Sequence, residues 1–367
     1  MGDTSPELNP DLVYDLFWGI FKPQFIRLAL QLDVFTPLAA GSTTAEQVAQ
    51  SCHCDIFGVK SLLDYLCSLQ VLERHGNMYA LTPTAATFLV KGRKAYAGDM
   101  ILHYTDEALF DNIRQSLRSG KPSPLGENFV QDAWLESYLP WRIPKSLEMW
   151  QAAGVKADHQ ASLRILDIAC GCAIKSLALA QASPNVRVTC LDTADVLVVA
   201  RDLAERMGVE SQVVFKPANL LDADLGENQF DAALTGQITH YLTKAQNASL
   251  FHRIYSALSP NGVLVIDCPM ATDEPAETTS FLTLVLWANS GGAAHSFEMY
   301  RPWLSDSGFR QIKQLSERWV VAIKQSGGQQ RLAPDAARLR VVAREPTLGS
   351  RHRSDAYEFN RNNNTIP

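Results

Sequence analysis

The feature that most constrains the fold is a regular alternation of short apolar runs and helix-length segments that begins at Leu163. Five of these runs have the length and composition of buried strands: residues 163–168, 186–191, 213–216, 230–235 and 263–267. Strands that alternate with helices predict a parallel sheet covered on both faces. After expected helices at 278–288 and 298–307, two closely spaced runs, 309–315 and 319–324, predict an antiparallel pair at the sheet edge.

The first hundred residues have a different organisation, in which helices precede a hairpin. Apolar residues recur at three- and four-residue spacings over 12–32, 44–51 and 56–69, and this periodicity predicts helices. Two short apolar runs within 71–81 flank Gly76-Asn77, a turn pair typical of a hairpin. Helix, helix and hairpin in this order are the outline of a winged helix.

Charge argues against DNA as the partner of this winged helix. The segment 56–69, in the position of a recognition helix, carries only Lys60 and Asp64 as charged residues. A helix that reads a groove needs basic residues to neutralise phosphates. The whole chain has a net charge of -6, so neither nucleic acid nor an acidic membrane surface is favoured. Four aromatic residues of the first helix could belong to a core or to a dimer face: Phe17, Trp18, Phe21 and Phe25.

The terminus and the cysteines indicate a cytoplasmic protein. The opening MGDTSPELNPDLVYD lacks the basic-then-apolar order of a secretory signal, and Pro6 stands where myristoylation needs Ser or Thr. No apolar run approaches the roughly 18 residues that span a bilayer. The seven cysteines lie mostly in apolar segments, which favours reduced thiols. Cys52-His53-Cys54 is too close-spaced for two ligands of one zinc, so we expect no metal. The roles of Cys170 and Cys172 stay open.

These patterns divide the chain into four parts. We expect a winged-helix-like domain over 1–105, a helical linker and pocket wall over 106–160, a catalytic domain over 161–324 and a polar tail over 325–367. The linker carries Trp134, Trp141 and Trp150, which form either a packed core or an aromatic wall of a substrate pocket. The tail has seven arginines against four acids and no sustained periodicity, so it is either passive or partner-binding.

The turn after the first sheet strand, ACGCA at 169–173, is the expected ligand site. A strand, a tight turn of small residues and a helix allow a nucleotide-like ligand to approach the backbone and the positive helix end. Asp192 ends the second strand, where its carboxylate can accept hydrogen bonds from both ribose hydroxyls. After the third strand, Leu220 could support an adenine ring while Asn219 meets its polar edge. Asp167, beneath Gly171 and the rest of the loop, can orient an ammonium or the loop amides.

An NAD site is the alternative for this loop and acid. The dinucleotide fingerprint places three glycines where this chain has Ala169, Gly171 and Ala173. A second mononucleotide-binding half is also missing from the pattern. Both observations weigh against NAD.

Six ordered motifs carry a resemblance to a known family: LDVFTPLAAGSTTAEQVA, VLERHGNMYALTPTA, LRILDIACGCA, CLDTADV, ITHYLTKAQNASLFHRIYSALSPNGVLVIDC and YRPWLSDSGF. From about Leu12 to Lys324 the chain resembles a class I S-adenosylmethionine-dependent methyltransferase of the small-molecule O-methyltransferase type. Enzymes of this family carry an N-terminal winged-helix dimerisation domain. The motifs are specific for fold and cofactor and leave the substrate open.

The resemblance implies a Rossmann-like seven-stranded sheet and a homodimer in which the N-terminal helices interlock. It implies that S-adenosyl-L-methionine lies over the first loop and leaves as S-adenosyl-L-homocysteine. By position in the motifs, the cofactor-binding residues are Asp167, Gly171, Asp192, Asn219 and Leu220.

His240, in GQITHYL, falls where the family keeps its general-base histidine. A structural histidine that caps the helix beginning near Thr243 is the alternative. Plant members follow the histidine with Asp-Trp, where this chain has Tyr241 and Leu242, and their second acidic orienter falls on Ala294. A histidine without its carboxylate is less basic and less fixed in tautomer. These departures favour an easily ionised nucleophile, catalysis by proximity, or a substrate-binding role for His240.

The sequence therefore predicts methyl transfer to a small aromatic or enolic natural-product acceptor, with oxygen favoured over carbon, nitrogen or sulfur. The candidate substrate-binding residues are Trp141, Gln237, His295 and Arg301. One alternative keeps the cofactor without methyl transfer, as a methyltransferase-like cyclase or pericyclase. Another is a winged-helix transcription regulator, against which the charge count argues.

Overall fold

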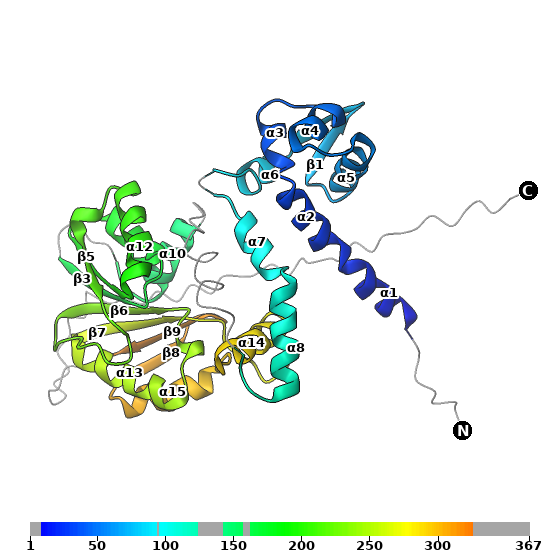
Figure 1. The fold of residues 1–367 in the computed structure, drawn as a ribbon. Coiled ribbons are helices and arrows are strands. Elements are labelled where there is room, and N and C mark those ends of the chain that lie inside the picture. The colour runs from blue at the N-terminus through cyan, green and yellow to red at the C-terminus, as the bar shows by residue number, and fades with distance from the viewer. Residues whose placement is uncertain (1–8, 94, 124–141, 157–161, 326–367) are drawn as a thin grey trace, which may run out of the picture. The chain divides into compact units, whose positions relative to one another are not determined.

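A computed structural model describes residues 9–93, 95–123, 142–156 and 162–325 (Figure 1). Trp134, Trp141 and the polar tail lie outside these ranges. Within them, every helix is too short or too polar to cross a membrane.

The N-terminal part consists of helices and one hairpin, as the sequence predicts. It contains α1 (Pro10–Gly19), α2 (Phe21–Gln31), α3 (Phe35–Ala39), α4 (Ala45–Cys52), α5 (Ile56–Ser68), β1 (Leu72–His75), β2 (Met78–Leu81) and α6 (Pro83–Phe88). The single helix expected over 12–32 is wrong, because the chain breaks it into α1 and α2 at Ile20. Pro23 lacks the N–H that would bond to the carbonyl of Gly19 four residues earlier, so the helix weakens there.

Helix α5, in the position of a recognition helix, binds the β1–β2 hairpin through the carboxylate of Asp64. Asp64 on α5 lies 2.8 Å from both Lys60 Nζ and Arg74 Nη1, and it accepts a 2.7 Å hydrogen bond from Tyr79. Both Arg74 and Tyr79 come from the hairpin. The basic residues nearest to this face are therefore engaged within the domain.

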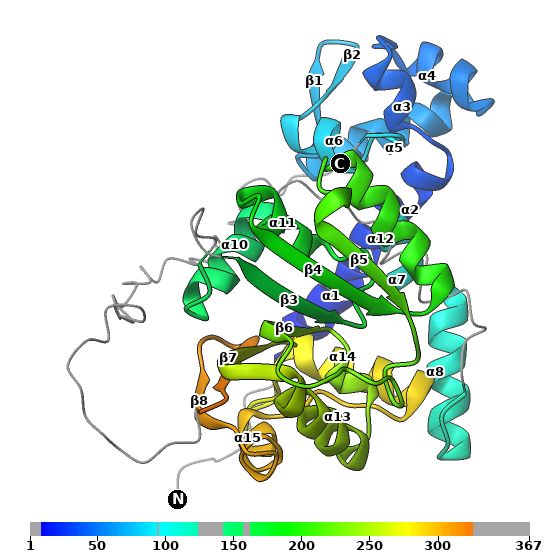
Figure 2. The same ribbon diagram turned by 90° about the vertical axis from the view of Figure 1, so that its left-hand side faces the viewer.

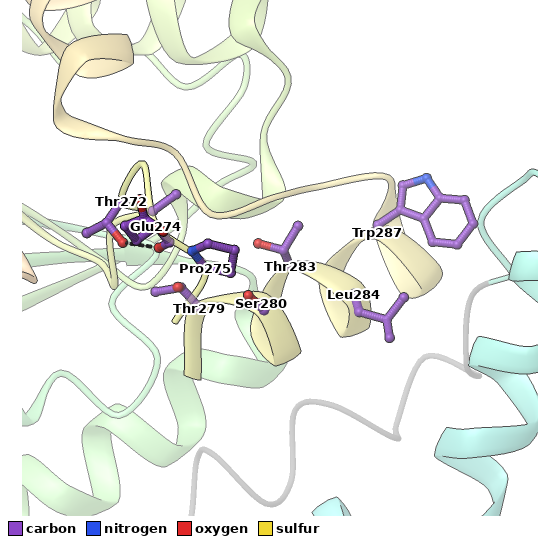
Figure 3. Close-up of a pocket in the computed structure, with 9 residues that line it drawn as sticks. Thr272, Glu274, Pro275, Thr279, Ser280, Thr283, Leu284 and Trp287 are labelled. Carbon is purple, nitrogen blue, oxygen red and sulfur yellow. Dashed lines mark hydrogen bonds between the residues drawn. The ribbon is translucent and has the colours of Figure 1, made fainter. Parts of the chain in front are cut away.

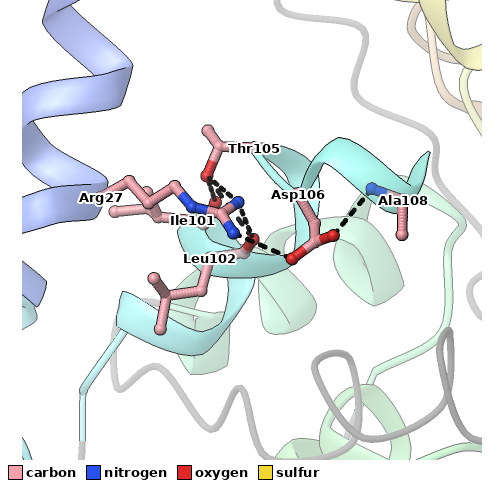
Figure 4. A network of polar contacts seen from close by, with 6 residues as sticks. All are labelled: Arg27, Ile101, Leu102, Thr105, Asp106 and Ala108. Carbon is pink, nitrogen blue, oxygen red and sulfur yellow. Dashed lines mark hydrogen bonds and ion pairs between the residues drawn. The ribbon is translucent and has the colours of Figure 1, made fainter. Parts of the chain in front are cut away.

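Arg27 ties the first helices to the next part of the chain. Its guanidinium reaches the Leu102 carbonyl at 3.2 Å, Thr105 at 3.3 Å and Asp106 at 2.9 Å, at the junction of α7 (Gly98–Tyr104) and α8 (Glu107–Ser119) (Figure 4). Asp106 also accepts from the Ala108 amide and so caps α8. One arginine thus fixes α2, α7 and the start of α8 together.

The remaining elements form a seven-stranded sheet in the order β5-β4-β3-β6-β7-β9-β8. The strands are β3 (Leu163–Ile168), β4 (Val186–Asp192), β5 (Val213–Pro217), β6 (Phe230–Gly236), β7 (Leu258–Asp267), β8 (Arg310–Gln314) and β9 (Trp319–Ile323). The first five pair in parallel, and β9 pairs antiparallel with both β7 and β8. The predicted fold class and the antiparallel edge are confirmed.

Helices cover both faces of this sheet (Figure 2). The covering helices are α10 (Arg142–Ala152), α11 (Ile174–Ala182), α12 (Ala194–Arg206), α13 (Lys244–Ala257) and α15 (Phe297–Asp306), and α14 (Glu277–Ser290) lies between β7 and α15 in the chain. Alternate residues of one strand point to opposite cores: Ile165 packs with α10, α11 and α12, whereas Leu166 packs with α13 and α15. This alternation fixes the register, so all parallel strands end at one edge of the sheet.

Helix α8 packs against α14 next to that edge. Leu109 and Ile113 form a small core with Val285 and Ala288. The Ser116 hydroxyl donates to the Ala288 carbonyl at 3.0 Å. Helix α14 is therefore held from its outer side, with another face free to line a cavity.

Candidate functional site

The loop after β3 is wound tightly around one glycine. Ala169, Gly171 and Ala173 have φ of 52°, 55° and 56°, the left-handed region that costs an alanine roughly 1–2 kcal/mol. The Cys170 amide donates to the Leu191 carbonyl at 3.2 Å, which anchors the loop on β4. Ala173 is the N-cap of α11 and has no polar side chain. The Ser176 amide donates to the Ala173 carbonyl at 3.0 Å, so in the first turn of α11 only the Ile174 and Lys175 amides are left for a ligand.

Asp192 at the end of β4 binds this loop through its carboxylate. One carboxylate oxygen accepts from the Gly171 amide at 2.9 Å and the other from the Thr193 amide at 2.8 Å. Burial raises the pKa of this carboxyl from its ordinary value, and the two amides oppose that shift. Because each oxygen has a second lone pair, the carboxylate can still accept from two ribose hydroxyls.

Asp167 lies buried at the end of β3 beneath the loop, with 2% of its surface exposed. Burial raises its pKa to about 7, against the opposing effects of the Ser176 hydroxyl and the Lys175 ammonium. The Gly171 amide binds Asp192 and not Asp167, so the loop amides are oriented from the neighbouring strand. The carboxyl of Asp167 remains a candidate for a cationic ligand group.

The segment after β5 lies against Asp192. The Ala218 amide donates to the Asp192 carbonyl at 2.9 Å, and the Asn219 side chain accepts from the Leu221 amide at 2.9 Å. Leu220 is half-buried, and its carbonyl accepts from Arg253. The structure thus brings all five predicted cofactor residues to one edge of the sheet, with the Asn219 side-chain oxygen engaged in a local turn.

His240 lies at the same edge, in the short 3-10 helix Thr239–Tyr241 that follows β6. Its Nδ1 lies 2.9 Å from Cys268 Sγ at the end of β7. The next helix is capped by Thr243 and Gln246, so His240 is not its cap. The pKa of His240 is lowered to about 4, first by burial and then by His295, Arg318 and Lys175, against the opposing effect of Asp267. A buried imidazole of this kind is neutral at physiological pH.

The segment 291–295 after α14, called the strap below, contacts the backbone of His240. The Ala293 amide donates to the His240 carbonyl at 3.0 Å, and the Ala294 amide donates to the Thr283 hydroxyl at 3.3 Å. A Cβ added at Gly292 would lie 2.1 Å from the His240 carbonyl oxygen. Glycine is thus required for the strap to approach this backbone. Ala294, the expected place of the second acidic orienter, offers no acid there.

The candidate substrate residues are only partly brought together. Gln237 follows β6 with a φ of 63°, and its backbone N–H donates to the backbone carbonyl of Asp267 at 2.9 Å. His295 is buried beside Tyr300 and Trp303, and its Nδ1 has no partner among the described residues. Both lie next to His240.

The other two candidates are not placed there. Arg301 lies on the surface of α15 with 54% of its side chain exposed, bound to Glu298 at 3.0 Å and stacked over Phe297. Its assignment to the site is therefore wrong, because a pair on its own helix holds it outward. Trp141 lies outside the described residues. Trp150 is fully buried and donates its indole N–H to the Lys175 carbonyl at 2.9 Å, so it is a core residue.

A cluster of charges that sequence reasoning missed lies beside His240. The buried Asp267 carboxylate binds Lys175 Nζ at 2.9 Å and Arg318 Nη2 at 3.2 Å. These cations hold the pKa of Asp267 below its ordinary value despite burial, which opposes them. A Cβ at Gly236 would lie 2.8 Å from Lys175 Nζ, so this glycine leaves room for the ammonium. The signals available in the sequence were a lysine in the first turn after the loop and an aspartate at a strand end.

A cavity of about 400 Å³ opens near the strap, between the loop after β7 and one face of α14 (Figure 3). The loop contributes Ala271, Thr272, Glu274 and Pro275, and the helix contributes Thr279, Ser280, Thr283, Leu284 and Trp287. Its volume is within the range of small-molecule sites, and its lining is mixed apolar and hydroxyl. Thr283, which lines the cavity, also accepts from the Ala294 amide of the strap, and the neighbouring Ala293 amide donates to His240. The strap therefore connects the cavity lining to His240.

Comparisons with known proteins agree with this geometry. Residues 14–91 match the model of the O-methyltransferase dimerisation domain, and residues 165–262 match a methyltransferase domain. The chain is 23% identical over 322 residues to a 3-hydroxy-5-methyl-1-naphthoate 3-O-methyltransferase of Streptomyces sahachiroi, covering 85% of this chain and 93% of the relative. It is 26% identical to the N,N-dimethyltransferase OxyT of Streptomyces rimosus, over 87% of this chain and 98% of that one.

A solved structure shares the whole fold. Human N-acetylserotonin methyltransferase in complex with S-adenosylmethionine superposes with a TM-score of 0.70 at 19% identity, over 89% of this chain and 100% of that one. The two matched domains are those of methyltransferases that use S-adenosylmethionine. The order of the motifs agrees with this class, as does the group of five residues at the sheet edge, called the cradle below: Asp167, Gly171, Asp192, Asn219 and Leu220. The chain belongs to the small-molecule O-methyltransferase family of class I S-adenosylmethionine-dependent methyltransferases, with an N-terminal dimerisation domain.

Proposed function

We propose that this enzyme transfers the methyl group to an oxygen of a small aromatic or enolic acceptor. The observation that carries the proposal is the position of His240, a neutral imidazole at the sheet edge that also carries the cofactor cradle, next to Lys175, Asp267 and Arg318. Of the two relatives described above, one is named for an oxygen acceptor and one for a nitrogen acceptor.

The cradle residues have distinct roles in this proposal. Asp192 holds the Gly171 turn in shape and accepts from the ribose hydroxyls. Asp167 faces the ammonium of the cofactor's amino-acid part, and Leu220 and Asn219 contact the adenine. Bound S-adenosylmethionine supplies an electrophilic methyl group on a positively charged sulfur. The chain supplies position, because a methyl transfer needs the acceptor in line and close to contact distance.

The charges around His240 favour an anionic oxygen. Lys175 and Arg318 together carry two positive charges, and Asp267 carries one negative charge that binds both. With His240 neutral, this cluster has an excess positive charge at the sheet edge. A partly buried excess of positive charge stabilises a phenolate or enolate more than a neutral alcohol. Gln237 and His295 are the further polar groups that we assign to the acceptor side.

The cavity along α14 is our candidate for the body of the acceptor. Leu284 and Trp287 offer apolar surface for a ring, and Thr279, Ser280 and Thr283 offer hydroxyls for its polar substituents. Figure 3 shows these side chains along one face of the helix. A flat aromatic molecule of modest size suits such a lining.

The test is incubation of the purified enzyme with S-adenosylmethionine and a panel of hydroxylated naphthoates, phenols, aminophenols and thiols. We expect an acceptor to gain the mass of one methylene unit, with the new methyl on oxygen in the product's NMR spectrum. Methylation on nitrogen, carbon or sulfur only would overturn the oxygen assignment. A rearranged product of unchanged mass would identify the cyclase alternative. This alternative is compatible with the partner of His240 Nδ1, which is the Cys268 thiol and not a carboxylate.

We also propose that the enzyme is a homodimer formed through α1. All ten residues of this helix are described and none is buried. Its exposed apolar side chains are Leu12, Val13, Tyr14, Leu16, Phe17 and Trp18, and Ile20 follows them. Such a surface is far too apolar for a helix that remains in water. The matched dimerisation domain begins at residue 14, within this helix.

A further inference from the structure

We propose that Cys268 positions His240, holding its imidazole in the tautomer with the proton on Nε2, so that His240 donates a hydrogen bond to the acceptor oxygen and does not remove its proton. The tautomer follows from the contacts around Cys268. The part about the acceptor rests on the proposed function.

A chain of hydrogen bonds ends at the imidazole. The Tyr300 hydroxyl lies 2.7 Å from Thr239 Oγ1, Thr239 Oγ1 donates to Cys268 Sγ at 3.3 Å, and Cys268 Sγ lies 2.9 Å from His240 Nδ1. Thr239 has one hydroxyl proton, which the sulfur receives, so Tyr300 is the donor to Thr239. Each member thus passes its proton in the same direction, toward His240.

The thiol is the last donor of this chain. Cys268 is fully buried, and burial raises its pKa, so the sulfur keeps its proton. The sulfur already accepts from Thr239, and its own proton has Nδ1 as acceptor. A neutral imidazole that accepts at Nδ1 carries its proton on Nε2.

The reverse arrangement leaves a donor without a partner. If Nδ1–H donated to the sulfur, the whole chain would reverse: the thiol would donate to Thr239 and Thr239 to Tyr300, and the Tyr300 hydroxyl proton would then have no further acceptor in the hydrogen bonds of the described residues. A buried donor left unpaired is unfavourable. The doubly protonated ring is disfavoured too, because Lys175, Arg318 and His295 face it while Asp267, the facing carboxylate, is bound by both cations.

This arrangement selects acceptors that reach the site already ionised. The hydroxyl proton goes to solvent before binding; the oxygen then forms the bond to the methyl carbon, and the electron pair of the breaking carbon–sulfur bond stays with sulfur. His240 Nε2–H and the excess positive charge of Lys175 and Arg318 hold the oxyanion meanwhile. Hydroxyls made acidic by conjugation to a carbonyl fit this requirement, whereas simple alcohols do not.

The test reads the tautomer directly, without an acceptor. Enzyme labelled with 15N at histidine is saturated with S-adenosylhomocysteine, and the His240 signals are assigned by their loss in His240→Asn. We expect long-range 1H–15N correlations typical of a ring protonated on Nε2, unchanged between about pH 6 and 8. Protonation on Nδ1, or titration near the ordinary histidine pKa, overturns the proposal.

Variants at residue 268 complete the test. Cys268→Ser keeps a donor and should keep the Nε2–H pattern, whereas Cys268→Ala should lose it or give a mixture of tautomers. Cys190→Ala is the matched control, a buried thiol on β4 whose removal should leave the His240 signals unchanged. Calorimetry with S-adenosylhomocysteine shows that each variant is folded. An unaltered Nε2–H pattern in a folded Cys268→Ala overturns the positioning role, whatever the acceptor assays show about methyl transfer.

Discussion

At the residue scale, Asp192 is the side chain on which cofactor binding depends most. Its carboxylate holds the Gly171 turn and, in our proposal, both ribose hydroxyls. Hydrogen bonds to a charged group contribute about 1.5–3 kcal/mol each, so Asp192→Ala should weaken S-adenosylhomocysteine by at least 10- to 100-fold. Calorimetric titration measures this. Asp195→Ala, an exposed carboxylate at the start of α12, should bind like the wild type; equal affinity of all three proteins would remove Asp192 from the site.

Asp167 should make cofactor binding depend on pH. Burial raises its pKa to about 7, so below that pH the carboxyl of the free enzyme is protonated. If the carboxylate binds the cofactor ammonium, binding below pH 7 must release that proton, and Kd should rise toward tenfold per pH unit as the pH falls. Above pH 7 the affinity should level off.

Titrations of S-adenosylhomocysteine in buffers of different ionisation enthalpy check this linkage. The wild type should release close to one proton at a pH below that pKa, and Asp167→Asn should bind weakly with no proton released. A wild-type Kd that is flat across this range would show that Asp167 does not meet the ammonium as a carboxylate.

Some of these residues could be found from the sequence and others could not, for a physical reason. Asp192 and Gly171 are recognisable because a parallel β-α-β unit places the end of one strand beside the turn after its neighbour. Cys268 and Lys175 meet His240 and Asp267 across β6, β7 and α11, and such contacts depend on register and side-chain direction. Arg301 was assigned wrongly because a pair three residues away on a helix competes with any distant partner.

At the element scale, the strap over His240 should control the reaction more than the fold. Gly292→Ala places a Cβ against the His240 carbonyl oxygen, at 2.1 Å in the present geometry, so the strap or the 3-10 helix must shift. Misplacement of a positioning group by about 1 Å can cost on the order of 100-fold in rate. We expect kcat to fall by 10-fold or more, with S-adenosylhomocysteine affinity and the unfolding midpoint close to the wild type.

Steady-state kinetics with the acceptor found in the panel provide the measurement. Gly58→Ala is the matched control, because a Cβ there meets only ordinary contact, at 3.6 Å from Asp55. Wild-type kcat in a folded Gly292→Ala would show that the strap does not set the position of His240.

Helices and strands could be predicted where the local sequence pattern agrees with the burial that the fold imposes. The central strands of the sheet follow from apolar runs that are largely buried, whereas β5 and β8 at its two ends are mostly exposed. Helix α4 is capped by Thr44 in a capping box that its sequence contains. Strand β7 begins at Leu258, five residues before the expected start, because Leu258 pairs with Phe230 across a register shift. No local periodicity announces such an irregular pairing.

At the scale of the whole molecule, α1 is incomplete by itself. Phe17 and Trp18 have 55% and 63% of their surface exposed, and their rings contact each other and Phe21 along one apolar surface. The sequence alone left these residues as either core or dimer face, and the structure removes the first possibility for α1. Within the described part of the chain no residue of α1 is buried, and a second copy of the chain would bury this surface.

Phe17→Asp combined with Trp18→Asp should therefore convert the enzyme to a monomer. Two buried aromatic anchors contribute several kcal/mol to an interface, and charges in their place add a desolvation cost. Sedimentation equilibrium should give twice the 40.5 kDa chain mass for the wild type and the single chain mass for the variant. Gln24→Asp, an exposed polar position on α2, adds a similar charge outside the apolar surface and should remain a dimer. A wild-type enzyme that sediments as a single chain, or a double variant that stays dimeric, would show that α1 is not the interface.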